Sequence, residues 1–375
     1  MSYLPNAQIK NEEPETTPST AIGFHGPSWR LYSPMMHFLA NTYYLLLFTR
    51  MSFQANREQG RYHHRVRSRA AGLISQAQEL NDGSIPEKAY RKIQWYMVST
   101  LFMGELAAHL AGYRIRSGEE RAYCYLGALI GLSDILVDDY QLEAPALEAL
   151  LQQHPGDTPI ERMFSIYYQA LFRLVDAGQA ERLKAAFAEL IHYQVASLRQ
   201  FDTGISEQDT IAITRGKGGA SLKLCAALLP GTEGPMQEAL YELGGFIQFL
   251  NDAQDLPKDA REGVVTFVRF RQGFPDILQY IEAERRRTFH SFSTLALKRS
   301  RLRYFLFCFH AMFVLITYKL GRYARLCAGE LDMQRIAVMD EKIFRANPFS
   351  MSFIRAALWP ILSFRLDRRP APSVI

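Results

Sequence analysis

The sequence predicts an all-α fold, a single bundle of about a dozen helices. Three observations favour it. Tracts without proline run over 87–144, 160–229 and 276–347, and such stretches permit long helices. Within these tracts apolar residues recur every three to four positions, which is the helical spacing. Alternating strand patterns bounded by turn pairs are scarce.

The elements follow in order along the chain. Five of the 17 prolines fall within the first 34 residues, which predicts an irregular leader over 1–30. We expect a helical domain over 31–365 and a basic tail over 366–375. Helical spacing is clear in Met97, Leu101, Met103, Leu106 and Leu110, and again in Phe187, Leu190, Ile191, Val195 and Leu198.

Composition excludes several classes of protein. The 375 residues are 48% hydrophobic, enough for a sizeable core, and the net charge of +5 gives no dense basic stripe of the kind that nucleic-acid binders carry. The four cysteines lie far apart without CxxC pairing, which fits neither a zinc site nor a disulfide framework. We therefore expect a reducing compartment, the cytoplasm, and no nucleic-acid partner.

Membrane insertion is also disfavoured. The polar start of the chain lacks the apolar segment of a secretory signal. The longest uncharged apolar run, Tyr304–Tyr318, has 15 residues and falls short of the ~20 needed to span a bilayer. A second apolar run, Met35–Thr49, is equally short. For the longest run we expect a buried core helix, with membrane contact as the alternative.

Two acidic clusters follow strongly apolar helical runs. In the first, Asp134 and Asp138 are four residues apart and share a helix face, with Asp139 next in sequence. Their Cβ atoms are expected about 5–6 Å apart, where like charges repel. A divalent cation between them would relieve this repulsion, and Mg²⁺ prefers carboxylate oxygens. The alternative is a solvated acidic helix end.

The second cluster steps by four residues through Asn251, Asp255 and Asp259, and Gln248 precedes it by three. In a continuous helix these side chains would line one face. Pro257 interrupts the pattern, so we expect the helix to end or kink near Leu256 and Asp259 to reach back from a loop.

Together the two clusters indicate one type of substrate. Acidic side chains at the mouth of an apolar cavity are costly unless cations pair with them. Such a cavity suits an apolar chain that carries a diphosphate, because metal ions bridging the phosphate oxygens stabilise the departing charge. Apolar walls would shield a carbocation from water.

At these residues the sequence resembles the class I isoprenoid synthases, the all-α superfamily of prenyl transferases, squalene/phytoene synthases and terpene cyclases. The segment 134–139 resembles the first aspartate motif of the squalene/phytoene synthase branch. The segment 248–263 resembles that branch's second motif, including the trailing Ala-Arg-x-Gly. It is also similar to variants of the cyclase NDxx(S/T)xxxE motif and of the prenyl transferase QxxDDxxD motif. A more distant similarity is to bacterial large-terpene cyclases.

The resemblance implies a bundle around an apolar cavity, three Mg²⁺ ions and ionisation of an allylic prenyl diphosphate. It implies metal-binding roles for the aspartates and the asparagine of the motifs, namely Asp134, Asp138, Asp139, Asn251, Asp255 and Asp259. Of these, Asp134, Asp138, Asn251 and Asp255 are the expected catalytic residues. The Tyr-Cys-x-x-Val-Ala-Gly-x-Val-Gly stretch of squalene/phytoene synthases is replaced by Thr214–Leu222, which favours cyclisation over head-to-head condensation.

Basic residues near the motifs are candidates for binding the diphosphate. Arg215 and Lys217 lie among three glycines that would allow a kinked helix to approach the ligand, or that merely break the helix beside solvated cations. Arg322-Tyr323 resembles the Arg-Tyr pair of cyclases, or is a surface arginine beside a core tyrosine. Arg261 binds phosphate or pairs with a neighbouring carboxylate.

Seven aromatic residues either line the cavity or belong to the core: Tyr96, Phe102, Phe246, Phe249, Phe305, Phe309 and Phe313. The basic residues Arg365, Arg368 and Arg369 follow an apolar helix and indicate either peripheral contact with an anionic membrane or a solvated tail. The adjacent His63 and His64 do not share a helix face and receive no role.

The leading hypothesis is an Mg²⁺-dependent class I terpene synthase that releases diphosphate from a linear prenyl diphosphate and cyclises or quenches the carbocation. The alternative within enzymes is a prenyl transferase or a squalene/phytoene-type condensing synthase. The non-enzyme alternative is a helical scaffold or membrane-associated protein. Chain length of the substrate, product skeleton and oligomeric state are not encoded in any of these patterns.

Overall fold

Helices make up the regular structure of the computed structural model, which describes residues 34–152, 154–339 and 351–366. These residues form 14 α-helices and no strand, so the predicted all-α class is confirmed. The predicted leader lies outside the described residues, as does the predicted tail after Leu366. The helices are α1 (Pro34–Asn56), α2 (Arg61–Glu79), α3 (Glu87–Ala111), α4 (Ser117–Asp138), α5 (Ala144–Leu151), α6 (Pro159–Phe172), α7 (Ala177–Ser197), η1 (Leu198–Phe201), α8 (Glu207–Ala227), α9 (Pro235–Gln254), α10 (Leu256–Glu262), η2 (Phe267–Phe270), α11 (Phe274–Ser293), α12 (Arg299–Leu326), α13 (Met333–Val338) and α15 (Met351–Leu362).

Local signals set many helix ends. At the start of α6, the Thr158 hydroxyl accepts from the backbone N–H of Glu161, and the Glu161 carboxylate accepts from the backbone N–H of Thr158 in return. This reciprocal cap satisfies two N–H groups that the helix leaves unpaired. At the end of α3, Gly112 adopts a positive φ of 82°, the left-handed conformation in which glycine has no steric penalty.

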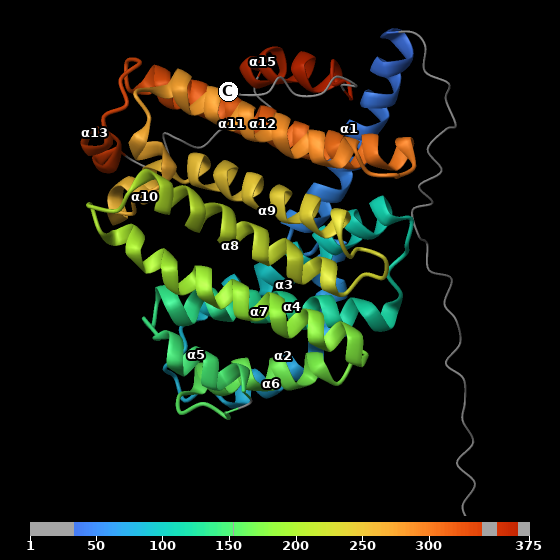
Figure 1. Cartoon of the computed structure of the whole chain (residues 1–375), viewed down its shortest axis with the longest axis vertical. Coiled ribbons are helices and arrows are strands. Elements are labelled where there is room, and N and C mark those ends of the chain that lie inside the picture. Colours follow the sequence, from blue (N-terminus) through green and yellow to red (C-terminus); the bar gives the residue numbers. More distant parts are fainter. Residues whose placement is uncertain (1–33, 153, 340–350, 367–375) are drawn as a thin grey trace, which may run out of the picture. The chain divides into compact units, whose positions relative to one another are not determined.

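Helix α4 runs through the interior of the bundle. Every residue from Ala122 to Val137 is buried, because α3, α6, α7 and α8 pack around it. A helix that is apolar on all sides requires such cover. A Cβ added at Gly127 would meet the α3 backbone at 2.6 Å, so this glycine permits the close approach of α3 and α4. In Figure 1, α7, α8 and α9 follow one another in that order toward α12.

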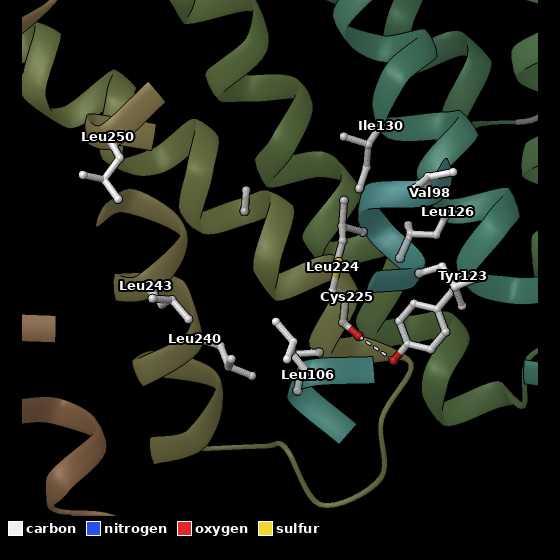
Figure 2. Close-up of a cluster of buried hydrophobic side chains, with 14 of the residues drawn as sticks. Val98, Leu106, Tyr123, Leu126, Ile130, Leu224, Cys225, Leu240, Leu243 and Leu250 are labelled. Atoms are coloured by element: carbon white, nitrogen blue, oxygen red, sulfur yellow. Dashed lines mark hydrogen bonds between the residues drawn. The ribbon is translucent and has the colours of Figure 1, made fainter. Parts of the chain in front are cut away.

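The core between α4 and α8 is shown in Figure 2. Tyr123 of α4 is fully buried and its hydroxyl donates to the backbone carbonyl of Cys225 on α8, at 3.2 Å. This bond satisfies the phenol hydroxyl inside an apolar environment formed by leucines of α3, α8 and α9. All four cysteines are free and buried.

Helix α12 contains the longer apolar run noted in the sequence. Within the described residues it is the one helix long and apolar enough to cross a membrane, by length and composition alone. However, 67% of its most apolar window is buried inside the protein, which is typical of a core helix. The prediction that Tyr304–Tyr318 forms a core helix agrees with this burial. The other run, Met35–Thr49, lies in α1 and is buried on one side only.

Candidate functional site

The first acidic cluster lies at the end of α4. Asp134 is buried, with 6% of its surface exposed, and Asp138 one turn later is exposed at the last residue of the helix. Asp139 follows as the C-cap, half-exposed, with its carboxylate 4.0 Å from the ammonium of Lys88. Asp134 and Asp138 are one helical turn apart, so the carboxylate of Asp134 lies inside the bundle and that of Asp138 lies at its surface.

Asp134 is surrounded by polar partners from three other helices. The ammonium of Lys92 lies 2.8 Å from one carboxylate oxygen, and that of Lys217 lies 3.0 Å from the other. The Tyr96 hydroxyl donates at 3.1 Å and the Gln194 side-chain amide at 3.4 Å. Burial by itself would raise the pKa of Asp134, but Lys217 and Lys92 outweigh it and hold that pKa well below its usual range. Asp134 is therefore an ionised carboxylate neutralised by two ammonium groups.

The second acidic cluster spans a helix break. Helix α9 ends at Gln254 and α10 begins at Leu256, so the predicted end near Leu256 is confirmed. The expectation that Asp259 reaches back from a loop is wrong, because Asp259 lies within α10. Pro257 falls in the first turn of α10, where its missing N–H costs nothing, so it starts a new helix.

Tyr323 of α12 stabilises the break between α9 and α10. Its hydroxyl donates to the backbone carbonyl of Gln254, the last residue of α9, at 3.0 Å. Tyr323 is fully buried, and its neighbour Arg322 is half-buried on α12. Of the predicted Arg-Tyr pair, the tyrosine therefore positions the helix end that carries Asp255.

The buried carboxylate of the second cluster belongs to Asp252, which is not among the predicted site residues. It accepts from the Thr214 hydroxyl at 3.1 Å and from the Gln248 side-chain amide at 3.0 Å. Burial raises the pKa of Asp252 to about 6, although both hydrogen bonds lower it. Asn251, selected from the spacing, is exposed instead.

Asp259 carries the most perturbed carboxyl group of this cluster. Burial, followed by the charges of Asp252 and Asp255, raises its pKa to about 8. The three aspartates are therefore close enough to repel one another. Lys258 is the nearby cation that lowers the pKa of Asp259.

The two clusters meet at α8, which lies between α7 and α9 (Figure 1). Lys217 of α8 lies 3.0 Å from Asp134 and 3.9 Å from Asp138. Burial would lower the pKa of Lys217, but the charges of Asp134, Asp138 and Asp252 raise it. One lysine thus interacts with carboxylates of both clusters, and the clusters share one region of the bundle.

Arg215 does not join this region. On an α-helix, side chains two residues apart differ in direction by a rotation of about 200°. The side chains of Arg215 and Lys217 therefore point in nearly opposite directions. The Arg215 guanidinium pairs with the buried Glu284 of α11, at 2.9 and 3.1 Å, and lies over the ring of Phe249. Arg261, in contrast, is exposed on α10 two residues beyond Asp259.

The glycines beside these basic residues pack against neighbouring helices. Helix α8 is continuous, so the expected kink is absent. A Cβ at Gly218 would lie 2.2 Å from the backbone oxygen of Gly244 on α9, and one at Gly216 would meet the ring of Tyr193. These glycines therefore allow close helix packing and leave no approach for a ligand along their own faces.

The predicted cavity aromatics divide into two groups. Phe246, Phe249, Phe305 and Phe309 are fully buried in the core, which agrees with the core alternative. Phe313 lines a groove of about 600 Å³ between α12 and α15. A second cavity, of about 290 Å³, lies among α2, α3 and α6. Neither of these two cavities is lined by the carboxylates of the clusters.

The residues fit an Mg²⁺ site that a substrate would help to build. Among the described residues, no three His, Cys, Asp or Glu side chains are placed to hold a metal ion by themselves. Mg²⁺ in phosphate-binding protein sites is usually bound by one or two carboxylates together with substrate phosphates. Asp138, Asp255 and Asp259 offer oxygen donors of that kind. Asp134 fits less well, because both of its oxygens already contact lysines.

Several residues of this region carry no motif in the sequence: Lys92, Gln194, Thr214 and Asp252. Weak signals exist in the spacing, since Lys92 and Tyr96 are four residues apart and Thr214 and Lys217 are three apart, so each pair shares a helix face. Nothing in the sequence alone directs those faces toward the acidic clusters.

Comparison with known proteins gives similarity of chain path only. No protein-family model and no curated protein matches the sequence. A dehydrosqualene synthase in complex with ligand is similar to this chain, with 12% identity and a TM-score of 0.44, over 74% of this chain and 97% of that one. A geranyltransferase from Legionella pneumophila is similar with 12% identity and a TM-score of 0.40, over 78% and 99%.

Proposed function

We propose that this protein is an Mg²⁺-dependent class I terpene synthase that ionises a linear prenyl diphosphate and cyclises or quenches the resulting carbocation. One observation carries the proposal: Lys217 of α8 contacts Asp134 and Asp138, and Thr214, one turn earlier on the same helix, donates to Asp252. Helix α8 therefore brings the half-buried ammonium of Lys217 and the hydroxyl of Thr214 to carboxylates of α4 and α9. That combination suits a diphosphate with its metal ions.

The residues of the chain would act mainly by binding and charge neutralisation. Lys217 and Lys92 provide ammonium groups for the phosphate oxygens, and both already neutralise Asp134. Asp138, Asp255, Asp259 and the amide of Asn251 would hold Mg²⁺ against the diphosphate, with Asp139 adjacent. When bound, Mg²⁺ stabilises the negative charge that develops on the leaving diphosphate.

Diphosphate release from prenyl diphosphates of short to long chain length tests the proposal. With Mg²⁺ present, the wild type should release diphosphate from at least one chain length, and removal of Mg²⁺ by a chelator should abolish the release. Asp138→Asn and Asp255→Asn should each reduce kcat/KM about 100-fold, because each removes a charged oxygen donor. Glu238→Gln, at the opposite end of α9 and exposed, is the matched control and should retain activity.

Product mass separates the enzyme classes. A product with the carbon number of its substrate supports cyclisation or quenching, whereas a product with summed carbon numbers identifies a prenyl transferase or condensing synthase. Absence of release with every substrate, together with Asp138→Ala and Asn251→Ala affecting stability alone, would identify a non-catalytic helical protein.

A further inference from the structure

Helix α1 is apolar on both of its sides but buried on only one. Its inner side packs on α12 through Asn41, Tyr44, Phe48 and Met51, which are buried. Its opposite side carries exposed Met35, Phe38, Leu39, Tyr43, Leu46 and Phe53, and Leu46 is 66% exposed. Most of these recur every three to four residues and so form one stripe. A helix that is apolar all round is normally covered all round.

Helix α15 repeats this arrangement. Ala357, Ile361 and Leu362 are buried, whereas Met351, Ile354, Leu358 and Trp359 are exposed, and Trp359 is 69% exposed. Both α1 and α15 pack on α12 and on each other, as Figure 1 shows for the blue and red helices beside the orange one. Their exposed sides therefore both point away from α12. We call these exposed sides together the outer face.

The charged residues within the two helices of the outer face have a single sign. Neither α1 nor α15 contains an acidic residue, and each carries one exposed arginine, Arg50 and Arg355. Arg299, at the start of α12, and Arg365, just after α15, are also exposed beside them. Exposed apolar side chains bordered by arginines are the composition of a surface that lies on an anionic bilayer.

A buried cation strengthens this positive field. Arg303 is 4% exposed and donates to the backbone carbonyl of His37 and to the side-chain oxygen of Asn41. Its Nε and Nη1 atoms have no partner among the described residues. Burial, and then the charges of Arg303, Arg365 and Arg299, lower the pKa of His37, so these cations gather at one end of α1. No described carboxylate balances them there.

Self-association explains the outer face less well. In a symmetric dimer the same patch meets itself, so Arg50, Arg299 and Arg365 would approach their own copies. The two helices offer no acidic residue to pair with them. An anionic lipid surface provides both partners that the outer face lacks, acyl chains for the apolar stripe and phosphates for the arginines.

We propose that the outer face of α1 and α15 docks on the surface of a bilayer that contains anionic phospholipids. Both helices lie in the plane of the interface, with Leu46 and Leu358 among the acyl chains and Trp359 at the level of the headgroups. Helix α12 remains inside the protein beneath them. This docking is independent of any catalytic activity of the carboxylate clusters.

Co-flotation of the full-length protein with vesicles tests the docking. One vesicle type is phosphatidylcholine alone, and the other is an equal mixture of phosphatidylcholine and phosphatidylglycerol. The wild type should float with the mixed vesicles and lose this binding at high salt, because the attraction to phosphates is screened. Trp359→Glu and Leu46→Glu should each weaken binding at least about tenfold, since each replaces an inserted apolar side chain by a charge.

Matched variants separate docking from general effects of substitution. Trp95→Glu changes a tryptophan that is 57% exposed on α3, away from the outer face, and should bind like the wild type. Arg50→Gln should weaken binding to the mixed vesicles about fivefold, whereas Arg67→Gln, exposed on α2, should not. Unchanged circular dichroism would show that the variants fold.

Several results would overturn the proposal. The first is absence of binding to both vesicle types. The second is equal loss of binding in Trp359→Glu and Trp95→Glu, or equal binding of the wild type to both vesicle types. The third is a concentration-dependent dimer, measured by light scattering, that Leu46→Glu dissociates while vesicles bind nothing; the outer face would then join two copies of the chain.

Discussion

At the scale of single residues, compensation of buried charge dominates the candidate site. Asp134 would be costly to bury as a lone anion, and Lys92 and Lys217 bring two ammonium groups to its two oxygens. Among the described residues no ammonium forms an ion pair with Asp252, which accepts instead from Thr214 and Gln248, and burial raises its pKa to about 6 while that of Asp134 falls. The pKa values of Asp134 and Asp252 thus shift in opposite directions because their partners differ.

Lys217→Met should lower the free energy of unfolding by about 2–3 kcal/mol, because it leaves a buried carboxylate with half of its compensation. Lys223→Met is the matched control on the same helix. Lys223 pairs with Glu189 at 2.6 Å, but both partners are more exposed than Asp134. Its loss should cost less than about 1 kcal/mol. Urea unfolding of both variants measures the difference, and equal losses would contradict the role assigned to Lys217.

At the scale of elements, the approach of α8 to α9 decides how close the two clusters come. Gly218 and Gly244 face each other, and a Cβ on either would lie within 2.2 Å of the opposite backbone oxygen. Any side chain there would separate the helices that carry Lys217 and Asp252. Close helix packing at small residues therefore serves the geometry of the site.

Gly218→Ala should lower the free energy of unfolding by about 3 kcal/mol, since the backbone of α9 must shift to accommodate the methyl group. Gly72→Ala, on the exposed side of α2 where a Cβ meets nothing within 4 Å, should instead raise it by about 0.5–1 kcal/mol through helix propensity. Chemical denaturation of the two variants should give changes of opposite sign. A stabilised Gly218→Ala would show that α8 and α9 are not in contact there.

The contact between α12 and α15 should make stability depend on acid. A ring nitrogen of His310 lies 3.0 Å from the backbone oxygen of Pro360, and burial lowers the pKa of His310 to about 4. In the unfolded chain this pKa is about 6.5, so as pH falls below that value the unfolded state takes up a proton that the folded state resists. Stability is therefore complete above about pH 6.5 and decreases toward about pH 4.

His310→Gln keeps a neutral polar group and removes this titration. The fall in unfolding free energy between about pH 7 and about pH 5 should be smaller in His310→Gln than in the wild type. Buried His109, whose pKa is also lowered to about 4, accounts for part of the remaining dependence. Identical pH dependence in both proteins would mean that His310 is not the group that resists protonation.

At the scale of the whole molecule, one buried asparagine connects helices from both ends of the described chain. Asn41 of α1 donates to the backbone carbonyls of Leu362 and Phe364 and accepts from Arg303 of α12. It therefore holds the two helices of the outer face against α12. This contact joins two elements that are distant in the chain, since Asn41 and Leu362 lie 321 residues apart in sequence.

Asn41→Ala should lower the free energy of unfolding by about 3 kcal/mol, because two backbone carbonyls and a buried guanidinium lose a partner together. Asn56→Ala removes an asparagine from the same helix whose amide bonds only the carbonyl of Ser52 at the surface, and should cost less than about 0.5 kcal/mol. Thermal unfolding of the two variants provides the comparison. Similar Tm values for both would exclude Asn41 as the connection.

The sequence by itself determined the helical class, the break before Pro257 and the spacing of the carboxylates, because each depends on neighbours within a few residues. The tertiary structure decided which side chains meet. Asn251 fits the motif spacing, yet the rotation of α9 turns Asp252 toward Thr214 and leaves Asn251 exposed. Lys92 and Lys217 reach Asp134 from helices far away in sequence. The rotation and separation of packed helices result from all their contacts together, including Gly218 against Gly244, and no local pattern encodes them.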